Sequence, residues 1–152
     1  MNSFLKEVEE RFELPAQDIR TYTPLTLAFV GDNVYDLVIR TILLEEGRRK
    51  LNDIHKMKSS FVNAGTQARI AEHLMNSGIL DDEEKDMYRK GRNAKTQSHA
   101  KNADLGDYHK ATGLEALIGF LYLSGREERT VELIKFGLDA LKEKNGEDHG
   151  ST

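Results

Sequence analysis

The sequence contains no cysteine in 152 residues. A disulfide framework and a zinc site built on thiolates are therefore excluded, and the composition fits the reducing cytoplasm. No apolar run reaches about 18 residues without an ionisable group, so we expect no transmembrane helix. The N-terminal residues MNSFLKEVEERF are charged and acidic. We expect no signal peptide there, because such a peptide starts with a basic stub before an apolar segment.

An excess of positive charge is missing as well. The formal net charge is −4, from 22 Lys and Arg against 26 Asp and Glu, which argues against a nucleic-acid binder that is basic all over. The bases are nevertheless concentrated in RRKLNDIHKMK at 48–58 and RKGRNAKTQSHAK at 89–101. The acids lie mainly in residues 7–13, 81–86 and 139–148. This segregation allows a polyanion-binding face on an acidic protein.

Helical periodicity runs through the chain, and no stretch shows sustained strand-like alternation. The predicted helices are 3–13, 24–46, 51–77 with a break near Ser59-Ser60 or Gly65, 82–90, 108–124 and 126–144. Thr23 and Pro24 mark the start of the helix over 24–46, and Gly47 marks its end. The length suits one domain, and no repeat or linker interrupts it. We predict a single all-α domain over 1–144 with a disordered tail at 145–152.

The helices over 24–46 and 108–124 are apolar on most sides and should therefore be central. Each carries an acid among residues of a type that is usually buried, Asp32 in the first and Glu115 in the second. If the helices pack together, these acids converge, and two carboxylates with no arginine between them suit a hard cation such as Mg²⁺. Two such apolar helices also offer more apolar surface than one small core needs. Part of that surface is expected at a two-fold homodimer interface.

Spacing alone leaves a structural role open for both acids. Asp32 would then accept a hydrogen bond from Tyr35 or Tyr122, and Glu115 would pair with Lys110 or an arginine. Buried ion pairs of this kind occur in proteins without any catalytic function.

Four separated stretches resemble the ribonuclease III family. LAFVGD at 27–32, followed by NVYDLVIR, resembles the family signature, an apolar helix that carries a Gly-Asp pair. TGLEALIGFL at 112–121 resembles the second acidic motif, in which Glu precedes Ala-Leu-Ile-Gly. NDIHKMKSSFVNAGTQA at 52–68 and GRNAK at 91–95 are similar to the Mini-ribonuclease III branch in particular. The resemblance covers residues 20–135, with the motifs in the right order.

The resemblance implies an all-helical catalytic domain that works as a homodimer and hydrolyses double-stranded RNA with Mg²⁺, leaving 5′-phosphates. Asp32 and Glu115 match the family's metal-binding and catalytic acids, with a metal-bound water as the nucleophile. Ordinary members of the family carry further carboxylates where this chain has Ala28 and Thr112, so fewer anionic ligands are expected here. Asp36 matches no family ligand, and we expect it to be structural or a partner in a salt bridge.

The basic stretches have two interpretations. A run of charges is ordinarily a solvated surface, but in a nuclease it is suited to bind RNA. The minor groove of A-form RNA is recognised by shape, through phosphates and 2′-hydroxyls, and a loop with Arg92, Asn93 and Lys95 would enter it. Lys56 and Lys58 would contact backbone phosphates. We expect no separate double-stranded RNA-binding domain, so that the catalytic dimer binds RNA by itself with salt-sensitive affinity.

Mini-ribonucleases III typically trim the precursor of large-subunit (23S) ribosomal RNA. The resemblance therefore implies that precursor as the substrate, and a ribosomal protein as a helper. Two alternatives are kept. The missing carboxylates at Ala28 and Thr112 motivate a non-catalytic RNA-binding or ribosome-assembly module. The acidic cluster at 81–84 motivates a nucleotide pyrophosphatase, although acids at the start of a helix are usually solvated caps.

Overall fold

The fold was analysed in a computed structural model that describes residues 3–95 and 104–150. These residues form seven α-helices and one 3-10 helix and contain no strand, so the predicted all-α class is confirmed. Among them, no helix is both long and apolar enough to cross a membrane. The elements are α1 Phe4–Arg11, η1 Ile19–Thr21, α2 Pro24–Glu45, α3 Leu51–Phe61, α4 Ala64–Ser77, α5 Asp82–Arg92, α6 Leu105–Leu123 and α7 Glu127–Gly150.

The ends of the helices follow local signals in the sequence. The Thr23 side chain caps α2 by accepting a hydrogen bond from a backbone amide of the first turn, where Pro24 lies. Gly47 follows α2 with φ +99°, a left-handed conformation that favours glycine. α5 begins with a capping box made by Asp81 and Glu84. These short-range signals account for the agreement between predicted and observed boundaries.

The helices differ from the predicted ones in two details. The break expected in 51–77 lies at Val62 and Asn63, between α3 and α4, and so falls between the two places predicted for it. The Asn63 side chain caps α4 and its amide donates to the carbonyls of Ser59 and Ser60 at 2.9 and 3.1 Å, which holds the corner. α7 continues past residue 144, where the last helix was predicted to end, to Gly150.

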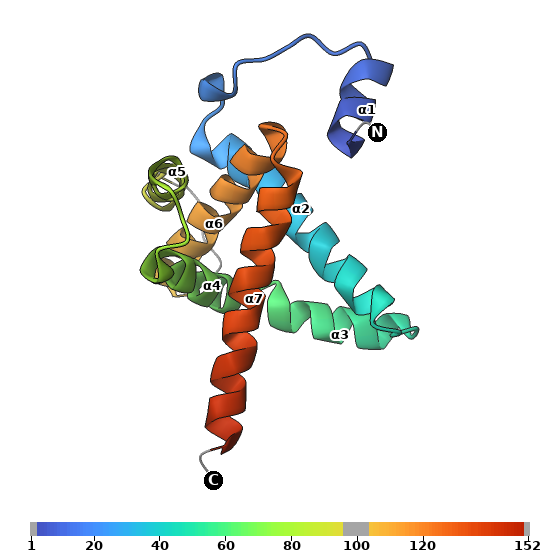
Figure 1. The fold of residues 1–152 in the computed structure, drawn as a ribbon, viewed down its shortest axis with the longest axis vertical. Helices are drawn as coiled ribbons and strands as arrows, with labels where there is room; N and C mark the ends of the chain where they lie inside the picture. The colour runs from blue at the N-terminus through green and yellow to red at the C-terminus, as the bar shows by residue number, and fades with distance from the viewer. Residues whose placement is uncertain (1–2, 96–103, 151–152) are drawn as a thin grey trace.

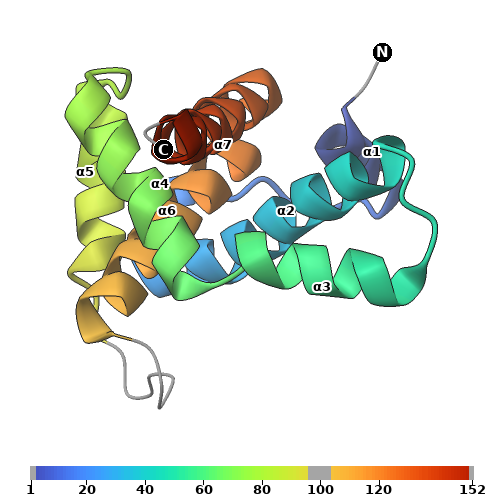
Figure 2. The same ribbon diagram turned by 90° about the horizontal axis from the view of Figure 1, so that it is seen from below.

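α6 is the central helix, as its apolar sequence predicts. It contacts α2, α4, α5 and α7, and ten of its residues are buried, all of them between Ala111 and Leu121. α4 and α5 cover one side of α6, and α2 crosses the other side (Figures 1 and 2). α1 lies at the edge of the molecule (Figure 1), and Leu5 is its one buried residue. This arrangement brings the two apolar helices of the sequence into direct contact.

Candidate active site

Two glycines allow α2 and α6 to touch along their backbones. A Cβ atom on Gly31 would lie 1.7 Å from the carbonyl oxygen of Glu115, and one on Gly119 would lie 1.9 Å from that of Leu27. Real Cβ atoms do not come so close to a backbone oxygen, so only glycine fits at either position. The crossing lies one residue from Asp32 and at Glu115 itself. It therefore brings the two predicted acids together.

The two carboxyl groups interact directly. Burial, the nearby charge of Asp32 and a hydrogen bond with the Asp32 side chain raise the pKa of Glu115 to about 8. Burial and a like charge both disfavour the ionised form of a carboxylic acid. The hydrogen bond also favours the protonated form, because only a protonated carboxyl can donate to another carboxylate. Glu115 is half-buried, whereas Asp32 is exposed. The pair therefore has a solvent-facing member and a more enclosed one.

The expectation that Asp32 is buried among apolar residues is wrong. α2 turns Leu27, Tyr35 and Ile39 toward the core, each with 2% exposure or less. Asp32 is exposed, although it still interacts with Glu115 on α6. Phe29 on the exposed side is 73% exposed. The apolar composition of α2 conceals this division, because large apolar residues occur on both of its faces. Asp32 is consequently accessible to a large ligand such as RNA.

The structural alternative for these acids finds no support. The Tyr35 hydroxyl donates to the carbonyl of Phe61 at 2.7 Å and not to Asp32, and Lys110 pairs with Glu72 across α6 and α4. Within residues 3–95 and 104–143, whose side chains the structure describes, no Lys, Arg or His forms an ion pair with either acid. The charges of this pair are therefore left without a protein counter-ion.

Asp36 is engaged in ion pairs, as the sequence predicted. Its carboxylate lies 2.8 Å from Arg40 on the same helix and 3.5 Å from Lys58 on α3. The pairing holds α3 against α2 one turn after Asp32. It also means that Lys58, one of the predicted RNA contacts, is half-buried against a carboxylate in the free chain.

The donor set at Asp32 and Glu115 fits a hard divalent cation. Mg²⁺ prefers carboxylate oxygens and retains several waters. Its charge would offset the burial and the repulsion by Asp32 that together raise the pKa of Glu115. The side chains described include no group of three or more His, Cys, Asp or Glu arranged for a metal ion. A cation here would therefore have two carboxylate-bearing residues beside it.

Small buried side chains occupy the two positions at which the ordinary enzymes of the resembled family carry further carboxylates. Ala28 is 7% exposed and Thr112 is 8% exposed. The Thr112 hydroxyl donates to the carbonyl of Tyr108 at 3.0 Å, within its own helix. Neither side chain adds an anionic ligand to the pair.

The other predicted RNA contacts lie at two places. Lys56 is exposed on α3. Arg92 ends α5, lies over the Tyr88 ring at 5.7 Å and contacts the Asn93 side chain at 3.4 Å, and Lys95 is exposed just beyond. Residues 96–103 of the predicted basic loop lie outside the described residues.

The acidic cluster at 81–84 serves the fold. Asp81 caps α5, and Glu83 pairs with Arg126 at 2.7 Å. Glu84 is 1% exposed and pairs with Arg129 at 2.7 Å, and hydrogen bonds from Arg129 lower its pKa despite its burial. These contacts tie α5 to the start of α7. They leave no support for a pyrophosphatase site.

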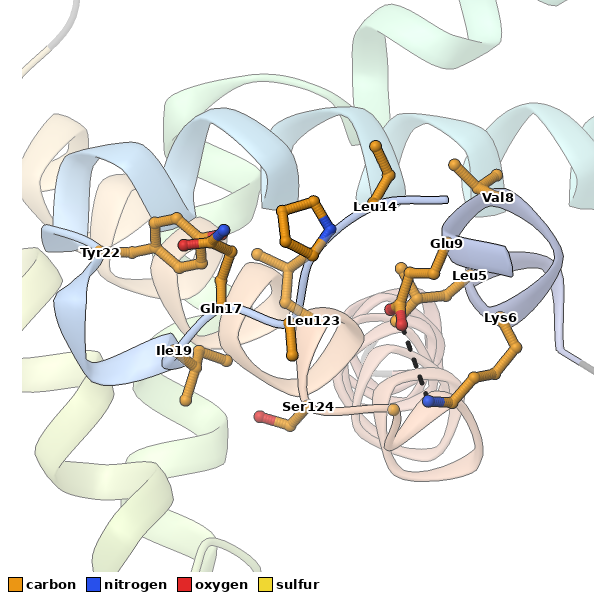
Figure 3. A pocket seen from close by; sticks show the side chains of 13 residues that line it. Leu5, Lys6, Val8, Glu9, Leu14, Gln17, Ile19, Tyr22, Leu123 and Ser124 are labelled. Carbon is orange, nitrogen blue, oxygen red and sulfur yellow. Dashed lines mark ion pairs between the residues drawn. The ribbon is translucent and has the colours of Figure 1, made fainter. Parts of the chain in front are cut away.

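A separate hollow lies beside α1. It has a volume of about 470 Å³ and runs between α1, residues 14–22 and the end of α6 (Figure 3). Leu5, Leu14, Tyr22 and Leu123 give it an apolar lining, with the Lys6–Glu9 ion pair of 3.6 Å at its rim. None of the predicted site residues lines it, so this hollow is distinct from the pair of acids.

Sequence analysis named Tyr35 only as a possible hydrogen-bond donor to Asp32, whereas it is a fully buried residue that donates to another acceptor. Burial raises the pKa of the Tyr35 phenol, and the charge of Glu115 adds to this effect. The sequence offered one signal, a polar hydroxyl three residues after Asp32 on the face of α2 that packs inward. The acceptor of that hydroxyl, the Phe61 carbonyl, had no signal because it lies on another helix.

Comparison with known proteins agrees with the fold. A model of the ribonuclease III domain matches residues 25–126, which include both acids. The chain belongs to the ribonuclease III family, and within it to the Mini-ribonuclease III branch. Proteins named Mini-ribonuclease 3 are similar over most of their length. That of Enterococcus faecalis is 40% identical over 85% of this chain and 98% of its own, and that of Staphylococcus aureus is 44% identical over 76% and 87%.

A solved structure supports the same conclusion. A crystal structure of a protein from Fusobacterium nucleatum is 33% identical, with a TM-score of 0.71 over 80% of this chain and 97% of that chain. The chain is accordingly an endoribonuclease of a family that acts on double-stranded RNA.

Proposed function

We propose that the chain is a Mg²⁺-dependent endoribonuclease whose metal ligands and catalytic residues are Asp32 and Glu115. The observation that carries the proposal is their convergence at the crossing of α2 and α6, with the pKa of Glu115 raised to about 8 and no protein cation beside them. Holding two carboxyl groups together costs free energy when both are ionised, as the raised pKa of Glu115 indicates. A bound cation would offset this cost, so the arrangement suits a metal site.

Each residue has a defined part in this mechanism. Asp32, exposed on α2, faces the RNA backbone, and Glu115, held below it, fixes the inner side of the site. A divalent cation held there supplies positive charge to the scissile phosphate, to the attacking water and to the leaving 3′ oxygen. Glu115 must be ionised to act as a ligand, so cation binding displaces its proton. The products then carry 5′-phosphates.

In this proposal, RNA is bound by basic and polar side chains at the surface. The contacts to phosphates and 2′-hydroxyls would come from Lys56 on α3 and from Arg92, Asn93 and Lys95 at or just after the end of α5. Lys58 would join them by exchanging its contact with Asp36 for a phosphate. Few of these charges lie close together, so the affinity should be modest and salt-sensitive.

A homodimer would cover the exposed face of α2. Leu25, Phe29, Leu37 and Leu44 on this helix are 39%, 73%, 61% and 55% exposed. Several large apolar side chains exposed on one helix mark an interaction surface, and a two-fold interface buries the same residues on both copies. Because Asp32 lies on the same helix among these residues, a dimer through α2 would place two sites near its axis. Sedimentation at micromolar concentration should give a dimer for the wild type and a monomer for Phe29→Asp.

We assign the natural substrate as the precursor of 23S ribosomal RNA in the cytoplasm, with a ribosomal protein as helper. The support is the similarity to proteins named Mini-ribonuclease 3, together with an RNA surface too sparse in charge for tight binding alone. Trimming of that precursor should be faster when ribosomal proteins are bound to it than when the RNA is naked.

The proposal is tested with purified protein, a long RNA duplex and either Mg²⁺ or EDTA. We expect cleavage with Mg²⁺, none with EDTA, and products that carry 5′-phosphates. Duplex binding that survives EDTA, with no cleavage at any Mg²⁺ concentration, would instead favour the non-catalytic RNA-binding module.

A further inference from the structure

α5 carries a row of three cationic side chains. Lys85, Arg89 and Arg92 lie at i, i+4 and i+7 of this helix, a spacing that places them on one face. The row is about 10 Å long, because a helix rises 1.5 Å per residue. The Arg89 side chain is exposed and the other two are half-buried. α5 itself lies at an outer edge of the molecule, beside α6 (Figures 1 and 2).

The acids nearest to Lys85 and Arg89 do not neutralise them. Asp86 lies three residues before Arg89 but pairs with Lys90 at 3.0 Å. Asp82 lies three residues before Lys85 and forms no ion pair with it. Among the acids that the structure describes, none forms an ion pair with Lys85 or Arg89. One face of α5 therefore presents two cations without a protein counter-ion.

The helix dipole accounts for only part of this row. Cations in the last turn of a helix are favoured by the partial negative charge there, and Arg89 and Arg92 lie in the last turn of α5. Lys85 lies at the other end, directly after the three acids of the first turn, where the dipole favours anions. The dipole thus gives no reason for a cation at Lys85, whereas a bound anion would.

The end of the row is fixed beside the proposed active site. A Cβ atom on Gly91 would lie 2.6 Å from the Cβ atom of Ala116, and one on Gly113 would lie 2.8 Å from the carbonyl oxygen of Tyr88. These close contacts hold the last turns of α5 against the turn of α6 that contains Glu115. The row of cations therefore starts next to this turn and leads away from it along α5.

We propose that Lys85 and Arg89 bind phosphates of the duplex RNA substrate and extend along α5 the surface that begins at Arg92. A duplex is a rigid polyanion, so cations in a row beside the site suit its backbone and not the scissile phosphate itself. Contacts of this kind position a duplex without reading its sequence. The inference rests on the proposed function and deepens it, because it adds a binding element for the same substrate.

The test is filter binding of a long RNA duplex across a salt series, in EDTA so that the duplex stays intact. Each cation that contacts a phosphate contributes about one to the slope of log affinity against log salt. We expect this slope to fall by about one in Lys85→Gln and in Arg89→Gln, and by about two in the double variant. Arg89→Lys keeps the charge and should keep the wild-type slope. With Mg²⁺, the double variant should cleave with a raised KM and an unchanged kcat.

Lys90→Gln is the matched control. It removes the same charge from the same helix, but Lys90 lies on another face and is paired with Asp86. We expect the wild-type slope for this control. An equal fall of the slope in Lys90→Gln would mean that only net charge matters, and this would overturn the proposal. A wild-type slope in the double variant would also overturn it, whether or not the melting temperature of that variant changes.

The result is distinguishable from a failure of the proposed function. If the wild type cleaves a duplex with Mg²⁺ and the double variant binds with the wild-type slope, the nuclease stands and only the role of the row on α5 is lost. If the wild type neither binds nor cleaves a duplex, the proposed function is refuted, and the role of Lys85 and Arg89 is refuted with it.

Discussion

Asp32 and Glu115 lie together where α2 crosses α6, one exposed and the other half-buried. Their contact depends on Gly31 and Gly119, since neither crossing point has room for a Cβ atom. The site is thus made by a backbone contact between the two most apolar helices, and its chemistry is that of two acids without a protein counter-ion.

Removing either charge should abolish cleavage. We expect Asp32→Asn and Glu115→Gln each to lower the cleavage rate of duplex RNA by at least about 100-fold, because a metal ligand is lost while the shape is kept. Asp86→Asn and Glu72→Gln change exposed acids of other helices and should keep wild-type rates. Full activity in either site variant would remove that residue from the metal site.

The raised pKa of Glu115 makes the metal-free protein sensitive to pH. Between its ordinary value of 4.5 and about 8, the folded chain keeps a proton that the unfolded chain releases, so stability falls as pH rises through this window. The free energy of unfolding should fall by roughly 2 kcal/mol over this window, a figure reduced because solvent around Asp32 screens its interaction with Glu115. Glu115→Gln should lack this component. The check is urea unfolding in EDTA at pH 5.5 and pH 8, and parallel pH profiles for the two proteins would contradict the expectation.

The helix crossing should tolerate no side chain. A methyl group at Gly119 would meet the Leu27 carbonyl oxygen at 1.9 Å, so Gly119→Ala should cost about 2–3 kcal/mol of unfolding free energy and separate the acids. Gly65→Ala is the control, since its methyl group would be 3.4 Å from the nearest atom, the Asn63 side-chain oxygen, and should be neutral or slightly stabilising. Thermal melts and cleavage rates check both variants, and a wild-type melt for Gly119→Ala would refute the close crossing.

The sequence predicted the parts of this structure that depend on short-range signals. The Thr23-Pro24 start of α2 and the capping of α5 by Asp81 need only neighbouring residues. The pairing of Asp32 with Glu115 was reached through motif resemblance and the packing expected of two apolar helices. Features that depend on contacts between distant parts of the chain could not be predicted in this way. The exposure of Asp32 depends on which face of α2 meets α6, and the composition of that helix does not distinguish its faces.

Two lysines on α3 should differ in their effect on RNA binding. Lys56 is exposed, so Lys56→Ala should weaken duplex binding and reduce the slope of log affinity against log salt by about one. Lys58 is paired with Asp36, so Lys58→Ala should lower stability as well, by less than about 1 kcal/mol. Lys6→Ala, on the peripheral helix α1, should leave the salt slope unchanged. Filter binding across a salt series checks the three variants, and equal slopes for Lys56→Ala and the wild type would exclude Lys56 from the interface.

The location of the cation is the most direct test of the proposed site. Crystals of the protein soaked in Mn²⁺ should show anomalous density between the carboxylates of Asp32 and Glu115, and crystals of Glu115→Gln should lack it. If the wild-type crystals bind Mn²⁺ elsewhere, or show no anomalous density beside this pair, the two acids do not form the metal site.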